Sequence, residues 1–274
     1  MKKTINCLIQ NIFSSIFNLF FIISAIICFL LCFTSVIYTN AVTGKEYIAL
    51  EIVLNKSIIA NSSIGGKEIL SWSVSPYITI FIPIVSSFPF VTAFCSERIS
   101  GNMRFVISRV GKITYYISKF SSAVISGYLS VMIGYIMYSV VIILSFGYTG
   151  TLNELVKIFI GMGIYGAVSV LPSFILSSFI KNKYMICCFP FILMHFYYTI
   201  ISKIQDVLLA KGMDEIVFKI NFLYPNTLKD VLLYQKIESI VNTNNYTIVY
   251  YLILCLSAFA GFTIIMNRRL DHGQ

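Results

Sequence analysis

Charge is scarce in this sequence. Aspartate, glutamate, lysine and arginine together make up 11% of its 274 residues, against about 25% in an ordinary soluble domain. Hydrophobic residues make up 58%, and a surface of that composition is solvated by lipid rather than by water. The composition therefore predicts a protein that works inside a membrane, and it leaves no room for a soluble catalytic domain of ordinary size.

The motifs of common enzymes are also missing. No G-x-x-x-x-G-K-[ST] phosphate loop occurs, so we do not expect the chain to hydrolyse ATP by that route. No H-E-x-x-H motif, pair of intramembrane aspartates or Ser/His/Asp set can be assembled. Gly161, Gly163 and Gly166 match a dinucleotide-binding pattern formally, but they lie inside an apolar run and not after a buried strand. We expect them to let two helices approach closely, and we predict no catalytic residue and no cofactor in this chain.

A metal site is not indicated either. Cys28 and Cys32 are four residues apart, which places them on one face of a helix. They could bind a metal, but no histidine or acid accompanies them. We therefore interpret them as two small apolar packing residues.

What the sequence does contain is long apolar runs. Each is long enough to cross a hydrocarbon core of about 30 Å at about 1.5 Å per helical residue. Lipid offers no hydrogen bonds to the backbone, so spans are helices or closed barrels, and these runs lack the alternation of barrel strands. We predict an all-α membrane protein, one transmembrane domain over residues 1–274, whose six spans cover residues 18–38, 76–95, 120–146, 154–180, 184–202 and 247–266.

The basic residues predict how the chain sits in the membrane. If the N-terminus is cytoplasmic, the inner segments hold a large excess of lysine and arginine, opposed only by Glu97 and Asp271. The outer loops 39–75 and 203–246 carry as many acids as lysines. By the positive-inside rule both termini are cytoplasmic. The net charge of +9 then predicts contact with anionic membrane lipids and not with nucleic acid.

Three segments outside the spans carry further predictions. Apolar residues recur at helical spacing over residues 5–17, which indicates an interfacial helix before the first span; a long, tilted first span is the alternative. The Ser/Gly-rich residues 61–66 indicate flexibility in the first outer loop. In the second outer loop, residues 206–209 and 214–218 are amphipathic and predict short helices over the outer face.

A translocation path is suggested by three residues inside the spans. Pro83 and Pro89 follow Pro76 in the second span, and each interior proline removes a hydrogen bond, so we expect a bent or broken helix. His195, near the middle of the fifth span, is the clear ionisable group deep in the membrane. A proton-linked role and a neutral histidine bonded to a neighbouring helix both remain open.

The strongest local pattern is residues 96–112, which follow the second span. An acid–base pair, a Ser-Gly break and an amphipathic basic turn predict a short helix at the inner membrane surface. The segment resembles E-[RE]-x-x-G-[TN]-x-R-x-hydrophobic-hydrophobic-[ST]-[RK] in the permease subunits of ABC-2 type exporters. A proline often follows that pattern, and Val110-Gly111 stands there instead. The matching residues are Glu97, Arg98, Gly101, Asn102, Arg104, Ser108 and Arg109, with Lys119 where the family often has a lysine opening the third span.

The resemblance implies a function. In that family the segment is the coupling helix, which docks on a separate ATPase subunit that holds ATP and Mg²⁺. A second copy of the chain, or a similar permease, completes the transporter in the bacterial cell membrane. The cargo would be amphiphilic: a peptide, an antibiotic or a lipid-like molecule. The residues implied in ATPase coupling are Glu97, Arg98, Gly101, Arg104, Ser108, Arg109 and Lys112.

Other functions remain open at this point. A secondary transporter driven by an ion gradient would use His195 as its proton-linked group. The basic segment could also set the topology without any partner. A membrane-embedded enzyme is disfavoured by the missing catalytic motifs.

Overall fold

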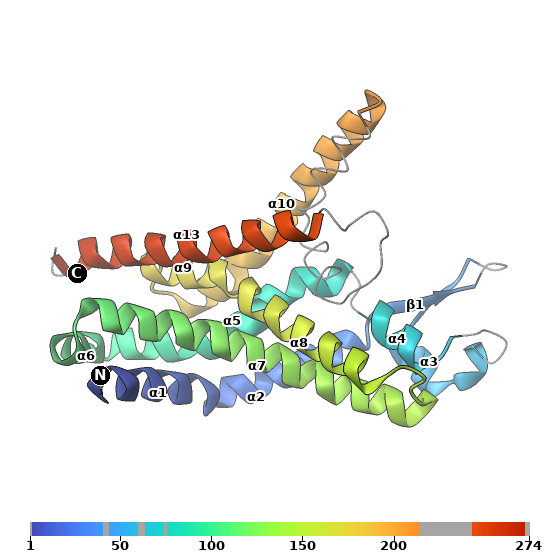
Figure 1. Ribbon diagram of the computed structural model, residues 1–274, viewed down its shortest axis with the longest axis horizontal. Coiled ribbons are helices and arrows are strands. Elements are labelled where there is room, and N and C mark those ends of the chain that lie inside the picture. Colours follow the sequence, from blue (N-terminus) through green and yellow to red (C-terminus); the bar gives the residue numbers. More distant parts are fainter. Residues whose placement is uncertain (1, 41–43, 60–63, 74–75, 214–242, 272–274) are drawn as a thin grey trace.

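Long helices packed lengthwise make up most of the protein, and both ends of the chain lie at the same end of the bundle (Figure 1). The computed structural model describes residues 2–40, 44–59, 64–73, 76–213 and 243–271. The main helices are α1 (Lys2–Ile16), α2 (Leu19–Cys32), α5 (Pro76–Ile99), α6 (Asn102–Val110), α7 (Lys112–Phe146), α8 (Leu152–Ser169), α9 (Leu171–Phe179), α10 (Lys183–Ala210) and α13 (Thr243–Asp271).

Among the residues that the structure describes, five helical stretches are long and apolar enough to cross a membrane, as a helical multi-pass membrane protein requires. Each corresponds to one of the apolar runs predicted after the first: Ile80–Ile99, Lys112–Phe146, Leu152–Phe179, Lys183–Ala210 and Val249–Arg269. A sixth span is present if α1 and α2, which meet at a bend of 55°, cross as one. The count of six and the cytoplasmic termini stay predictions.

The first predicted span is shorter than its apolar run. Helix α2 has 14 residues, which is about 21 Å of helix and less than the hydrocarbon thickness of about 30 Å. A separate α1 does precede it, as the apolar spacing predicts. Asn18 separates the two helices, because its side chain caps α2 by accepting a hydrogen bond from the Phe20 N–H at 3.3 Å. A crossing at this position therefore needs residues from α1 as well.

The far end of the bundle carries a folded unit in place of the predicted loop 39–75 (Figure 1). We call residues 36–72 the end unit. An antiparallel hairpin opens it and three short helices follow. Residues 61–63 of the Ser/Gly-rich part lie outside the described residues. The elements are β1 (Val36–Thr39), β2 (Glu46–Ile48), α3 (Ala49–Leu54), the 3-10 helix η1 (Lys56–Ile59) and α4 (Gly66–Trp72).

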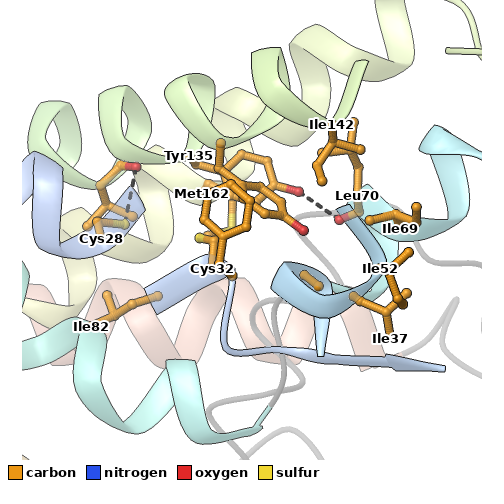
Figure 2. Close-up of a cluster of buried hydrophobic side chains, with 14 of the residues drawn as sticks. Cys28, Cys32, Ile37, Ile52, Ile69, Leu70, Ile82, Tyr135, Ile142 and Met162 are labelled. Carbon is orange, nitrogen blue, oxygen red and sulfur yellow. Dashed lines mark hydrogen bonds between the residues drawn. The ribbon is translucent and has the colours of Figure 1, made fainter. Parts of the chain in front are cut away.

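The end unit is attached to the bundle by a buried core. Ile52, Ile69 and Leu70 are fully or almost fully buried. They pack in one cluster with Cys28 and Cys32, which are fully buried. Figure 2 shows Tyr135 of α7 reaching toward Leu70, whose carbonyl accepts its hydroxyl at 2.7 Å. The two cysteines are packing residues, as the sequence predicts.

Helices α7 and α8 approach closely through glycines. A Cβ added at Gly166 would lie 2.6 Å from the carbonyl oxygen of Gly127, and one added at Gly163 would meet the ring of Tyr128. The prediction of close helix packing is therefore confirmed for Gly163 and Gly166. The predicted span 154–180 is divided into α8 and α9 at Val170, two residues before Pro172.

The sequence predicts a bent or broken second span; helix α5 continues without a break through Pro83 and Pro89, and the bend stays a prediction. Proline at 89 cannot donate to the carbonyl of Val85, four residues earlier. The hydroxyl of Ser24 in α2 donates to that carbonyl at 2.6 Å instead. A neighbouring helix thus supplies the hydrogen bond that the proline removes.

The fifth apolar run gives a longer helix than predicted. Helix α10 continues to Ala210 and leaves the bundle at an angle (Figure 1). Residues 206–209 belong to its last turn and are not a separate short helix. The second predicted short helix, residues 214–218, lies outside the described residues.

Candidate functional site

Helix α6 is a short helix held between the ends of α5 and α7. Gly101 and Gly111 flank it with φ of 73° and 86°, a backbone conformation that glycine adopts without strain. The predicted surface helix within residues 96–112 is therefore present. Residues 96–99 still belong to α5, however, and Lys112 already opens α7.

The two sides of α6 differ in chemistry. Met103 is buried in a cluster that includes Phe94 of α5 and Phe262 of α13. The opposite side is exposed and combines positive charge with a phenylalanine ring that is 68% exposed. We call this exposed side the α6 face; it consists of Arg104, Phe105, Ser108, Arg109 and the adjacent Lys112.

Arg98 is part of the predicted coupling set, but its guanidinium is bonded inside the chain. Its Nη1 donates to the carbonyls of Ser177 and Ile180, at 2.9 Å each. Arg269 of α13 donates to the neighbouring carbonyl of Phe179 at 2.6 Å. The last carbonyls of a helix lack partners within the helix, and cations near that end are favourable. Both arginines thus cap α9.

Glu97 and Lys119 form an ion pair between α5 and α7. The acid of the acid–base pair in residues 96–112 thus forms its ion pair across two helices and not within its own segment. The Lys119 side chain is 4% exposed, and its ammonium also donates to Asn11 Oδ1 at 2.7 Å. The Tyr115 hydroxyl donates to the other carboxylate oxygen of Glu97 at 3.0 Å. Buried charges are stable when paired and hydrogen-bonded in this way.

The polar side of α1 completes these contacts and was missed from sequence. Asn11 Nδ2 donates to Ser118 Oγ at 2.7 Å, and the hydroxyls of Ser15 and Ser122 lie 2.6 Å apart. The available signal was Asn11 itself, a polar residue in a helix of apolar period. We call Asn11, Glu97, Tyr115, Ser118 and Lys119 the Lys119 network; it joins α1, α5 and α7.

The residues predicted for a translocation path lie in different environments. Pro83 and Pro89 are buried within α5. His195 is exposed on α10, and its imidazole has no hydrogen-bond or ion-pair partner among the described residues. The structure therefore does not place the three side chains in one buried path within a single chain.

An apolar cavity of about 520 Å³ lies between α8, α9, α10 and α13. Tyr197 and Tyr250 bring their hydroxyls within 3.5 Å of each other beside it. Large apolar side chains of α10 and α13 are exposed, among them Phe196 (61%), which lines the cavity, and Leu256 (70%). Such a surface has to be covered by lipid or by another membrane protein.

Comparison with known proteins adds no identification. No protein-family model matches the sequence, and no curated protein is similar to it. Within the described ranges, no three His, Cys, Asp or Glu side chains gather where they could hold a metal ion. The fold therefore identifies only the class of protein: a helical protein with several helices able to span a membrane.

Proposed function

We propose that the chain is the membrane-spanning permease subunit of an ATP-driven ABC exporter in the cell membrane. Its termini and α6 would face the cytoplasm, and a separate ATPase subunit would dock on the α6 face. The observation that carries this proposal is that Arg104, Phe105 and Arg109 are exposed together on one face of a helix anchored at both ends. Arginine and aromatic side chains are enriched at protein interfaces.

The contacts behind α6 support a mechanical role for it. Met103 packs against the aromatic cluster of α5, α9 and α13, where the rings of Phe174 and Phe262 stack at 4.2 Å. Closure of an ATPase pair would push on the α6 face, and this packing would pass the displacement to the spans. A close-packed protein interior switches between discrete arrangements and does not deform continuously. A transport cycle requires such discrete states.

The remaining components would come from other chains. ATP and Mg²⁺ would bind to the ATPase subunit. A second copy of this chain, or a similar permease, would cover exposed apolar parts of α10 and α13. The cargo would be amphiphilic, such as a peptide, an antibiotic or a lipid-like molecule, and would move outward between the two permeases.

Purification from native membranes in mild detergent, followed by an ATPase assay, tests the proposal. The wild-type chain should bring down a P-loop ATPase together with its activity. The double variant Arg104→Glu with Arg109→Glu should lose both, because it reverses the charge of the α6 face. The matched control is Lys181→Glu with Arg268→Glu, two exposed cations near the same end of the bundle; it should keep both.

Two results would contradict the proposal. Equal loss in the control pair would mean that general charge, and not the α6 face, retains the ATPase. A chain that purifies alone and transports in proteoliposomes without ATP would favour the ion-driven transporter. Loss of that transport in His195→Ala would then support the proton-linked role.

A further inference from the structure

A second cavity, of about 1080 Å³, lies beside the Lys119 network. Helices α1, α5 and α6 line it together with Phe20 of α2 and Lys183 at the start of α10. Small-molecule sites typically measure about 300–1,000 Å³, so this cavity is large enough for a ligand. Its position at the end of the bundle that carries α6 and the chain ends places it at the level of the lipid headgroups if the protein spans a membrane (Figure 1).

The charges that line the cavity favour an anion. The lining contains two cations, Arg109 and Lys183, and one acid, Glu97. Both carboxylate oxygens of Glu97 already accept hydrogen bonds, one from Lys119 and the other from Tyr115. Among the residues that the structure describes, neither lining cation has an acidic partner within ion-pair distance. An anionic group would supply the missing countercharge.

Lys183 is held in place for such a role. Its ammonium lies over the ring of Phe20 at 5.9 Å and over that of Tyr184 at 5.2 Å. Cation–π contacts of this kind fix a cation without neutralising it. Neutral donors stand around the same space, including the amides of Asn18 and Asn102. Phosphate oxygens accept hydrogen bonds from donors of both kinds.

Two features favour a lipid over a free phosphate ion. The lining includes apolar side chains, Phe20, Phe105 and Val106, which a phosphate ion would leave unused. Helix α1 turns its polar side toward the cavity and α7, whereas Ile5 and Phe13 on its other side are 51% and 53% exposed. An exposed apolar helix face of this kind is solvated by lipid, which places the cavity at the lipid boundary.

We propose that the cavity between α1, α5, α6 and the start of α10 binds the headgroup of an anionic phospholipid, with Lys183 and Arg109 contacting its phosphate. Arg109 belongs both to the α6 face and to the cavity lining, whereas Lys183 belongs to the lining alone, so Lys183→Gln tests lipid binding without changing the α6 face. A failure here and a failure of the exporter proposal are therefore separate results.

Native mass spectrometry of the purified chain, without any ATPase, measures this binding. Phosphatidylglycerol and phosphatidylcholine with identical acyl chains are titrated in parallel. We expect phosphatidylglycerol to bind about tenfold more tightly, and Lys183→Gln to weaken it about fivefold, the contribution of one cation near anionic lipid. The matched control is Lys181→Gln, an exposed lysine two residues away that does not line the cavity; it should bind like the wild type.

Three outcomes would overturn the proposal. The two lipids could bind equally, or the two lysine variants could lose the same affinity, which would indicate general attraction between the chain and anionic lipid. Free glycerol 3-phosphate could displace the lipid at the same concentration as the lipid itself, which would indicate a soluble phosphate ligand.

If Lys183→Gln fails to fold, a comparison of Arg109→Gln with Arg104→Gln tests the same point, because of these two arginines only Arg109 lines the cavity.

Discussion

The hydrogen bond from Ser24 to the carbonyl of Val85 predicts a specific coupling between two helices. Ser24 is fully buried, and its hydroxyl serves the carbonyl that Pro89 leaves without an N–H partner. Ser24→Ala therefore removes a hydrogen bond and leaves an unsatisfied buried acceptor. Interhelical hydrogen bonds in membrane proteins contribute about 0.6 kcal/mol on average, and an unsatisfied buried group costs about 1–3 kcal/mol. We expect Ser24→Ala to lower the free energy of unfolding by about 1–2 kcal/mol.

A double-mutant cycle separates this cause from ordinary loss of packing. In a Pro89→Ala background the new N–H of residue 89 can pair with the Val85 carbonyl. Ser24→Ala should then cost less than about 0.5 kcal/mol, so that the coupling energy is about 1 kcal/mol. The free energies come from unfolding in mixed detergent and SDS micelles, followed by far-UV circular dichroism.

A matched serine provides the control for the cycle. Ser126 of α7 is also fully buried, but its hydroxyl donates to the carbonyl of Ala123 on a helix without proline. Its replacement by alanine should cost the same in both backgrounds at residue 89. The reasoning is refuted if Ser24→Ala is equally costly with proline and with alanine at position 89.

Three further predictions concern packing and charge inside the bundle. Gly166→Leu should lower the melting temperature of the detergent-solubilised protein, whereas Gly261→Leu should not, because an added Cβ meets backbone at the first and nothing within 4 Å at the second. Lys119→Met should cost about 3–5 kcal/mol in the same unfolding assay, since it leaves the Glu97 carboxylate unpaired, and adding Glu97→Gln should recover part of that loss. Tyr135→Phe should cost about 1 kcal/mol and should speed hydrogen exchange of α4 amides, because α4 loses its hydrogen bond to α7; unchanged exchange in that variant would contradict this attachment.

The helical spans were predictable from sequence, but their ends were not. An apolar run is a property of composition, so each span after the first overlaps one predicted run, although α7 begins eight residues earlier and α10 ends eight residues later than predicted. The first run continues past Cys32 because the strand that follows, Val36–Thr39, is also apolar and partly buried. Hydrophobicity alone does not distinguish a membrane helix from a short strand packed against one.

The end unit shows what local sequence patterns miss. Its helices α3 and α4 have six and seven residues, too few for a clear helical period. They are stabilised by contacts with distant segments, such as the bond from Tyr135 to Leu70. Residues far apart in the chain decide this structure, and no pattern within residues 39–75 indicates them.

The candidate site was located by sequence, but the partners of its charges were not. The charge pattern placed a basic segment at residues 96–112, and the exposed α6 face lies there. It did not distinguish an exposed arginine from Arg98, which caps α9. Nor did it reveal that Glu97 pairs with Lys119 across two helices. Sign and position are local properties, whereas pairing depends on how the helices pack.

The arginine cap on α9 has a consequence for the order of assembly. Arg98 precedes α9 in the chain, but Arg269 follows its acceptor Phe179 by 90 residues. Because synthesis begins at the N-terminus, α9 has only the first of its two arginines while the intervening residues are being made. The second arrives when the last helix docks. A nascent chain halted before Arg269 would contain all the earlier apolar helices, but the carbonyl of Phe179 would still lack its arginine. That unpaired carbonyl distinguishes a stalled intermediate from a chain whose last helix has docked.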